Sequence, residues 1–481
     1  MVVTAFKDIK FGDSSAEREK SFDPQLLLEG FLDANGYINK VVNGPRFLVY
    51  GQKGSGKSAI CSRVELISGE DINVKVCDLQ RFNYNNFDSM DSNAEAPEIK
   101  NIRSWEIILH IALLELFSKD ERLNSIGGKD IVKNVLKDLE EVNILPAGDL
   151  STIVNNATKR ALKVNAKVIE YTRENQVRFY TNMYDNLRVA VHDSDLSKRS
   201  ILFIDGLDTV ITNKSNQKKI LSGLLHAATL INEELHTARI NAKIVVLCRT
   251  DILDMLNGPN LQKAIDDYGI ELDWYQHGAD RNDVNLIKML NLRSKLSLKR
   301  EVDIFEEFFP DEMSGKETFK FILDYTRYIP RDLIRLMNEI QANYRSPMRK
   351  SDFFNAINEY SASYFYGEIR NELHGMVSED QIENILRLLS QIGKYKMTTS
   401  ELENKSKTLG IKINLSEILP LLFNIGVIGN IRKIKGQDIF SFKFRERHSN
   451  FNPYNEIIVH LALQNTLKIR GGIDVKEVEY D

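Results

Sequence analysis

The sequence predicts an α/β fold: a parallel-sheet core with a helical insertion, followed by a helical lid and a smaller domain of three helices and a β-hairpin. Two observations carry this prediction. Short apolar runs of strand type alternate with helical patterns over the first 280 residues, as in parallel sheets covered on both faces. A glycine-rich turn follows the first of these runs and leads into a helix. The strands predicted for the sheet are 46–51, 73–78, 201–205, 243–248 and 269–274.

The glycine-rich turn fits the pattern G-x-x-x-x-G-K-[ST] at every fixed position. Its residues, with the one that follows, are Gly51, Gln52, Lys53, Gly54, Ser55, Gly56, Lys57, Ser58 and Ala59. Glycines let successive backbone N–H groups surround a polyphosphate at a helix N-terminus. Lys57 is spaced to reach the β- and γ-phosphates, and Ser58 to bind Mg²⁺. The sequence therefore predicts a P-loop that binds ATP and Mg²⁺; the alternative is a glycine-rich turn without a ligand.

The predicted strand 201–205 ends in an acid, Asp205, after four apolar residues. A buried parallel strand delivers such a carboxylate to the carboxyl edge of its sheet, where ligands bind. We expect Asp205 to complete the Mg²⁺ site with Ser58. A turn aspartate after a core strand is the alternative.

Composition narrows the class of protein. The chain has 481 residues, 42% of them hydrophobic and 27% charged, which is typical of globular proteins. A net charge of −4 gives no general basic surface, so contact with nucleic acid would need a local patch. Three cysteines without metal-ligand spacing, Cys61, Cys77 and Cys248, are expected to be buried, reduced thiols. With no signal-peptide or membrane-spanning pattern, we expect a cytoplasmic protein that does not contact membranes.

The rest of the chain divides by pattern. The gap between the P-loop and 201–205 is longer than a strand and two helices need, and its surplus, 103–198, has helical spacing. We predict five segments: an N-terminal arm (1–45), a P-loop ATPase core (46–280), a helical lid (281–370), a winged-helix domain (376–446) and a C-terminal tail (447–481). The insertion is either a solvated appendage or a partner surface.

These motifs resemble the AAA+/STAND branch of P-loop ATPases, which includes NACHT, KAP-type and origin-recognition-like proteins. The resemblance spans about 46–58 and 200–450, and it omits the insertion. It implies ATP binding with slow hydrolysis in a switch protein. AAA+ rings commonly carry an arginine finger in the helix before the last core strand; here 252–267 contains no arginine, so a hexameric motor is not expected.

The resemblance also implies roles for four further residues. Gly206 stands where ring-forming AAA+ enzymes have a glutamate, and Asp208 would orient the attacking water as in NACHT-type ATPases. Arg249, at the end of the strand 243–248, would sense the γ-phosphate. Pro330 and Arg331 match the lid motif G-x-P-[R], with proline near adenine and arginine on phosphate, although Tyr328 replaces the glycine.

Each of these roles has an alternative in the sequence. Asp208 is also a good helix cap. Arg249 could pair with Asp251. Pro330 suits the first position of a helix, where Arg331 would simply be solvated.

The winged-helix segment holds eleven Lys/Arg and seven Asp/Glu between 376 and 445. Its third helix, 415–426, would enter a major groove but carries no Lys or Arg. Nonspecific DNA contact would use the hairpin, through Arg432, Lys433 and Lys435. Structural or protein-contact use is the other interpretation.

We expect a cytoplasmic ATPase switch. The family resemblance implies a sensor or regulator in bacterial antiphage defence, with an effector protein encoded elsewhere and a possible homo-oligomer. Two alternatives remain: a DNA-binding, origin-recognition-like ATPase of replication or transposition, and a nucleotide-locked scaffold without turnover.

Overall fold

The computed structural model describes residues 2–469 except 81, 83, 85–86, 88–96, 125–129, 142, 147, 168–172, 208–214, 257–260, 346–347, 375 and 435. The chain divides into two compact units. The sheet unit comprises Asn35–Gly51 and Ile60–Leu272. The lid unit comprises Met1–Ala34, Gln52–Ala59 and Asp273–Asp481. Within the described ranges, no helix is both long and apolar enough to cross a membrane.

The sheet unit contains the predicted five-stranded parallel sheet, which confirms the α/β fold class. Its strand order is β2-β3-β4-β1-β5, and every pairing is parallel. The strands are β1 (Leu48–Gly51), β2 (Ile72–Asp78), β3 (Arg199–Asp205), β4 (Ala242–Arg249) and β5 (Gly269–Glu271). All eight residues of β4 are buried, as expected for a central strand covered on both faces.

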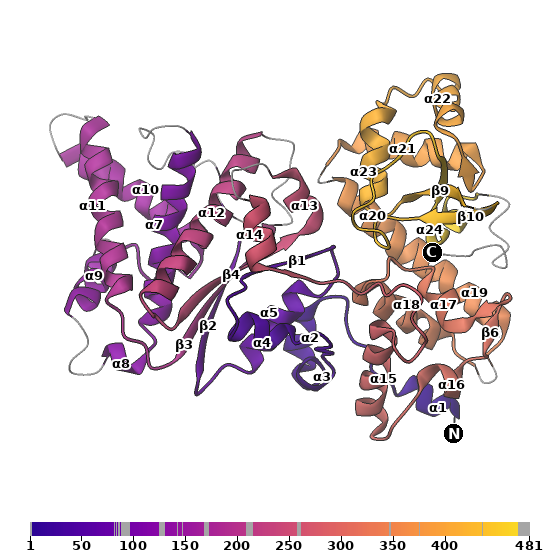
Figure 1. Ribbon diagram of the computed structural model, residues 1–481, viewed down its shortest axis with the longest axis horizontal. Coiled ribbons are helices and arrows are strands. Elements are labelled where there is room, and N and C mark those ends of the chain that lie inside the picture. Colours follow the sequence, from indigo (N-terminus) through magenta and orange to yellow (C-terminus); the bar gives the residue numbers. More distant parts are fainter. Residues whose placement is uncertain are drawn as a thin grey trace. The chain divides into compact units, whose positions relative to one another are not determined.

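Helices follow the strands as the sequence patterns predict (Figure 1). Those of the sheet unit are α4 (Tyr37–Val42), α5 (Lys57–Leu66, which begins in the P-loop), α7 (Pro97–Phe117), α8 (Glu121–Asn124), α9 (Asp130–Glu141), α10 (Leu150–Lys167), α11 (Arg173–His192), α12 (Ser215–Thr237), α13 (Thr250–Met255) and α14 (Leu261–Tyr268). Cys61, Cys77 and Cys248 are all buried in this unit.

The first helix of the predicted insertion belongs to the core. Helix α7 packs on β2, β3, α11 and α12, and Trp105 is fully buried. The Trp105 indole N–H donates to the Ile220 carbonyl oxygen at 2.8 Å. This part of 103–198 is therefore a structural layer of the sheet unit, not a solvated appendage.

The lid unit is built from helices and small sheets. Its N-terminal helices are α1 (Val2–Lys7), α2 (Ala16–Phe22) and α3 (Pro24–Glu29). Its middle elements are α15 (Asn285–Leu298), α16 (Ile304–Phe308), β6 (Glu312–Met313), β7 (Lys316–Glu317), α17 (Thr318–Leu323), α18 (Pro330–Asn343), α19 (Lys350–Glu359), the π-helix η2 (Tyr360–Phe365) and α20 (Tyr366–His374). Its last elements are α21 (Glu379–Ile392), β8 (Lys396–Met397), α22 (Thr399–Thr408), α23 (Leu415–Asn424), β9 (Ile428–Ile434), β10 (Gln437–Ser441), β11 (Glu456–Val459) and α24 (Leu461–Thr466).

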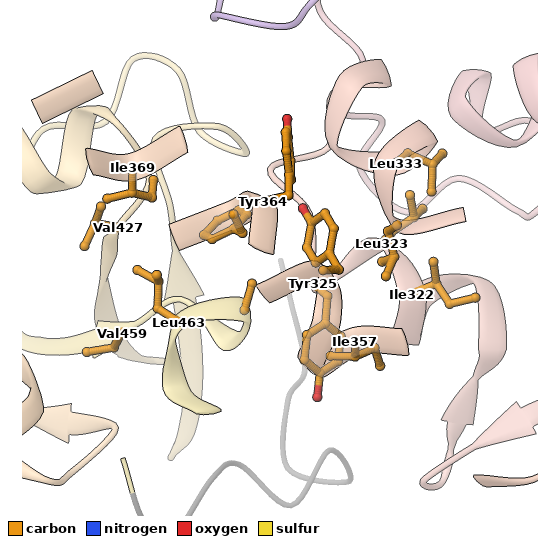
Figure 2. Packing of buried hydrophobic residues seen from close by; sticks show 14 of the residues in the cluster. Ile322, Leu323, Tyr325, Leu333, Ile357, Tyr364, Ile369, Val427, Val459 and Leu463 are labelled. Carbon is orange, nitrogen blue, oxygen red and sulfur yellow. The ribbon is translucent and has the colours of Figure 1, made fainter. Parts of the chain in front are cut away.

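The C-terminal elements have the helix and hairpin order predicted for a winged helix. One strand extends that pattern: β11 lies in the predicted tail, yet it sits between β9 and β8 in the sheet β10-β9-β11-β8. Apolar side chains of β11 reach the core shared with the middle helices. Figure 2 shows this core, with Leu333 and Ile357 from the middle helices and Val427, Val459 and Leu463 from the C-terminal elements. The lid and C-terminal segments are therefore one folded body.

Candidate nucleotide site

The turn that leaves β1 has the backbone of a P-loop. Gly54 and Gly56 have φ angles of 86° and 101°, in the left-handed region that favours glycine. The Ser55 N–H donates to the Gln52 carbonyl oxygen at 3.1 Å, which closes the turn. Lys57 then begins α5. The N-terminus of helix α5 thus follows the loop directly.

The two side chains predicted to serve phosphate and metal are adjacent. Lys57 Nζ donates to the Gln52 carbonyl oxygen at 3.0 Å, so the buried ammonium lies back over the loop. Ser58 occupies the first turn of α5. A hydroxyl here and a carboxylate from Asp205 are oxygen ligands of the kind that Mg²⁺ takes from proteins, with phosphate and water supplying the rest. The residues present therefore fit a Mg²⁺–nucleotide.

Within the lid unit, the predicted lid motif lies against the P-loop. The Arg331 N–H donates to the Gly54 carbonyl oxygen at 3.4 Å. A Cβ on Gly54 would lie 3.0 Å from both Arg331 Cβ and Ile329 Cδ1. Pro330 is the first residue of α18. Gly54 thus permits a close approach between the loop and the start of α18.

Tyr328 keeps the backbone conformation that a glycine would favour, with φ 54°. Its side chain accounts for the departure from the motif. The ring stacks on Phe444 with centroids 6.2 Å apart, and its hydroxyl donates to Asp324 Oδ1 at 2.9 Å. The Arg445 guanidinium lies 4.9 Å from the Tyr328 ring centroid. The tyrosine therefore joins the lid motif to the C-terminal elements at the cost of an unfavourable φ.

The sequence allowed a simply solvated Arg331, but in the structure its side chain contacts other groups. Its Nε donates to the Ser14 carbonyl oxygen at 3.0 Å, and its Nη1 lies 3.5 Å from Glu368 Oε2. The same Glu368 oxygen lies 3.1 Å from Lys53 Nζ of the P-loop. Sequence reasoning missed Glu368, because it lies 37 positions after Arg331 in an ordinary helical pattern.

A buried network of ion pairs and hydrogen bonds stabilises the segment 327–332, which contains the lid motif. Arg327 Nε donates to Asp332 Oδ2 at 2.9 Å, and its Nη1 donates to Glu372 Oε1 at 2.7 Å. The Tyr364 hydroxyl donates to Asp332 Oδ1 at 2.9 Å. Burial alone would raise the pKa of Asp332, but Arg327 outweighs it and holds that pKa below its usual value.

In the sheet unit, the predicted catalytic positions share the carboxyl edge of the sheet. Gly51 at the end of β1 pairs with Arg249 at the end of β4. Asp205 at the end of β3 pairs with Asp78 at the end of β2. The chain leaves this edge at Gly51 to enter the P-loop. The ends of parallel strands are where open α/β sheets bind their ligands.

Asp78 is a second carboxylate at this edge that sequence reasoning missed. Gly206 has φ 79°, and a Cβ there would lie 1.9 Å from Asp78 Oδ1. The Asp78 carboxylate thus occupies the space that a side chain at 206 would enter. It accepts from the Gln80 N–H at 2.8 Å, while Asp205 Oδ1 accepts from the Gly206 N–H at 2.7 Å. Only strand register could reveal this pairing.

Arg249 forms the ion pair that was the alternative for this residue. Its Nε and Nη2 donate to Asp251 Oδ1 and Oδ2 at 2.9 and 2.6 Å. The arginine is 7% exposed. Its role as a γ-phosphate sensor stays a prediction. In that role, Arg249 would have to exchange the Asp251 carboxylate for phosphate.

Two predicted residues, Asp208 and Lys435, lie outside the described residues. In the hairpin proposed for DNA contact, Arg432 Nη2 lies 2.6 Å from Glu446 Oε1, and Lys433 is exposed. The Arg445 side chain is 5% exposed, with its Nη2 2.9 Å from Asp324 Oδ1. Part of the basic charge counted in the sequence is thus neutralised within the fold.

Comparisons with known proteins match parts of this description. Residues 284–366 match the family described as the FunZ-associated C-terminal helical domain. A curated relative of Escherichia coli (strain K12), named "Putative transposon gamma-delta 80.3 kDa protein", is 21% identical over 94% of this chain. The chain spans 66% of that relative's length.

Three archaeal structures were also found. A Walker-type ATPase of Pyrococcus abyssi has a TM-score of 0.39 and 13% identity, and covers 87% of this chain and 95% of its own. The Orc1 protein of Aeropyrum pernix, solved in complex with DNA, has a TM-score of 0.36 and 13% identity. The match covers 95% of this chain and 97% of the Orc1 chain. Cdc6p of Pyrobaculum aerophilum has a TM-score of 0.30 and 14% identity over 95% of each chain.

Proposed function

We propose that this chain is a Mg²⁺–ATP-binding switch that hydrolyses ATP slowly. The observation that carries the proposal is the complete P-loop motif at the end of β1, with positive φ at Gly54 and Gly56 and Lys57 at the start of α5. A loop of this shape presents backbone N–H groups to phosphate oxygens. The parallel sheet supplies the setting in which such loops bind nucleotides.

The residues divide the work as follows. Lys57 neutralises charge on the β- and γ-phosphates, and the loop N–H groups orient them. Ser58 and Asp205 would hold Mg²⁺, which would neutralise phosphate charge when it is bound. As the family resemblance implies, Pro330 would contact adenine, and Arg331 and Arg249 would each contact phosphate.

Two carboxylates are candidates to orient the attacking water. Asp208 has the place implied by the family resemblance. Asp78 has the support of register, because it ends β2 level with Asp205 and fills the space left by Gly206. A carboxylate beside the metal-binding acid can accept a hydrogen bond from water and align it for in-line attack.

The lid contacts favour a switch over a motor. The P-loop residues 52–59 belong to the same compact unit as α18 and α20, and Tyr328 connects that region to Phe444 and Arg445. A nucleotide bound at the loop would thereby bias the C-terminal elements through direct packing.

For the biological role, we propose a sensor or regulator of a bacterial antiphage system that acts on an effector protein encoded elsewhere. The family resemblance supports this role. The alternative is a DNA-binding ATPase of replication or transposition, and the name of the Escherichia coli relative, which associates that protein with a transposon, favours it. A scaffold that binds ATP without turnover is the third possibility. Gel-shift titration over a range of salt concentrations distinguishes the DNA-binding ATPase from the antiphage regulator. Single-turnover hydrolysis distinguishes the scaffold from both.

The nucleotide site is tested by Lys57→Ala. We expect the variant to keep its thermal unfolding profile and lose tight binding of Mg²⁺–ATPγS in isothermal titration, because it lacks the ammonium that lies over the loop. Lys263→Ala, which removes an exposed lysine of α14, is the matched control and should bind as the wild type does. Equal affinity in the Lys57 variant would overturn the assignment.

A further inference from the structure

Helix α20 is attached to the lid motif by two ion pairs one helical turn apart. Glu368 contacts Arg331, with 3.5 Å between Oε2 and Nη1. Glu372 contacts Arg327, with 2.7 Å between Oε1 and Nη1. Residues four apart on a helix face the same way, so both glutamates project from one side of α20 toward the segment 327–331.

The two pairs differ in their access to solvent. The side chains of Arg327 and Glu372 are each 4% exposed, and Arg327 is bound to Asp332 as well. The side chains of Arg331 and Glu368 are 28% and 16% exposed. A buried, multiply bonded pair resists rearrangement because each partner would be left unpaired. The Arg331–Glu368 pair can exchange partners at a smaller penalty, because both side chains are more exposed and Glu368 keeps Lys53 as a partner.

Glu368 is also bound to the P-loop. Its Oε2 lies 3.1 Å from Lys53 Nζ, so one carboxylate oxygen lies between a P-loop ammonium and the lid guanidinium. Burial alone would raise the pKa of Glu368, but Lys53 and Arg331 outweigh burial and hold that pKa below its usual value. An ionised carboxylate between two cations presents a negative charge and acceptor oxygens, as a phosphate group does, although with less charge.

We propose that Glu368 is a positioning residue that competes with the terminal phosphate of ATP for Arg331. This inference rests on the proposed function. When ATP is bound, Arg331 exchanges the Glu368 carboxylate for phosphate, a partner of higher charge that it can grip with two N–H groups. ADP lacks that phosphate and leaves the Arg331–Glu368 pair in place. Glu368 thereby sets the preference of the site for ATP over ADP.

The exchange also loosens one end of α20. Its second attachment, Glu372 to Arg327, stays in place and acts as the pivot. Helix α20 directly follows the π-helix η2, and π-helical turns occur often at functional sites where a helix must adapt. Release of Glu368 would therefore let ATP binding shift α20, the helix that precedes α21 in the chain.

The test compares Glu368→Gln with wild type in titrations with Mg²⁺–ATPγS and with Mg²⁺–ADP. The amide keeps the shape of the side chain and removes its charge. We expect ATPγS affinity to rise roughly two- to fivefold, the range of partly exposed ion pairs, while ADP affinity stays within the error. The gain should shrink at high salt. It should also vanish when Arg331→Ala is added, because the competition is for that arginine.

Glu339→Gln is the matched control. Glu339 lies on α18 in the same unit, is 23% exposed and pairs with Arg335 at 3.7 Å, so its removal should leave both affinities unchanged. Glu368→Asp, which keeps the charge but shortens its reach, should give an intermediate affinity and serves if the glutamine variant unfolds. If the wild type binds ATPγS but the Glu368 variants bind it no more tightly, or more weakly, the inference is overturned while the proposed function stands. No ATPγS binding by wild type overturns the proposed function with it.

Discussion

At the scale of single residues, a missing side chain determines which acid lies beside Asp205 at the end of β3. Gly206 follows Asp205, and a Cβ at 206 would collide with Asp78 Oδ1 at 1.9 Å. No glutamate could stand at 206 without displacing Asp78. The sequence shows only that the usual acid is absent; the register of β2 on β3 shows which acid takes up the space.

This arrangement leads to a prediction about hydrolysis. Asp78→Asn and Asp208→Asn should both retain Mg²⁺–ATPγS binding, and the one that orients the attacking water should lose hydrolysis by about 10²–10⁴-fold. Single-turnover assays with radiolabelled ATP measure the rate. Should both variants hydrolyse at the wild-type rate, neither carboxylate has that role.

A second residue-scale prediction concerns Asp332 in the buried network. Asp332 is fully buried and accepts hydrogen bonds from Arg327 and Tyr364. Asp332→Ala leaves a buried guanidinium with one carboxylate fewer, so we expect the free energy of unfolding to fall by about 3–5 kcal/mol. Urea denaturation provides the measurement. Glu339→Ala, which breaks a partly exposed pair on the same helix, should cost less than about 1 kcal/mol. Similar losses in both variants would contradict the network's importance.

At the scale of elements, α7 combines a core helix with a titratable cluster. The Glu106 carboxyl lies 3.5 Å from the Tyr184 hydroxyl of α11, and Arg103 lies over the Tyr184 ring. Burial, with the nearby Glu234 carboxylate of α12, raises the pKa of Glu106 to about 7. Three helices thus bring one carboxyl into a setting where its charged form is disfavoured.

The raised pKa predicts how stability depends on pH. The folded protein holds the Glu106 proton more tightly than the unfolded chain, whose pKa is near 4.5. Stability is therefore fully retained below that value and falls as pH rises toward 7, by about 2 kcal/mol after allowance for partial exposure. The Glu106→Gln variant should not show this fall in stability with rising pH. The control Glu140→Gln, at an exposed position, should show it as the wild type does. Urea unfolding at several pH values between 4.5 and 8 tests this; parallel curves for wild type and Glu106→Gln would refute it.

At the scale of the whole molecule, the question is whether nucleotide changes the C-terminal elements. The P-loop touches α18 at Gly54 and α20 at Lys53, and Tyr328 and Arg445 continue that path to the C-terminal hairpin. These contacts lie in one folded body, so a ligand that alters the first can bias the last.

We therefore expect ATPγS to change hydrogen exchange at 320–345 and at 376–446. The Arg331→Ala variant should still bind ATPγS but lose these changes, because it cannot exchange Glu368 for phosphate. Mass spectrometry of peptides from both segments is the measurement. Identical protection with and without ATPγS in the wild type would instead indicate a static scaffold.

Local sequence was sufficient where structure depends on neighbours in the chain. The five strands, the P-loop from Gly51 to Ser58 and the helix at 415–426 were predicted, because period, glycine placement and capping are local signals. Asp205 and Arg249 were correctly assigned to strand ends for the same reason. The burial of α7 was not anticipated. The sequence shows a long apolar stretch there, but it does not show which helices and strands cover that stretch.

The sequence by itself determined a glycine-rich loop with the P-loop pattern on a parallel sheet, because that loop is a continuous run of eight residues whose conformations and charges are encoded one by one. Tertiary structure alone decided which distant groups meet it. Asp78 reaches Gly206 through strand register, Glu368 reaches Lys53 and Arg331 through helix packing, and β11 joins its sheet from the predicted tail. Such contacts depend on long-range packing free energy, which no local pattern carries.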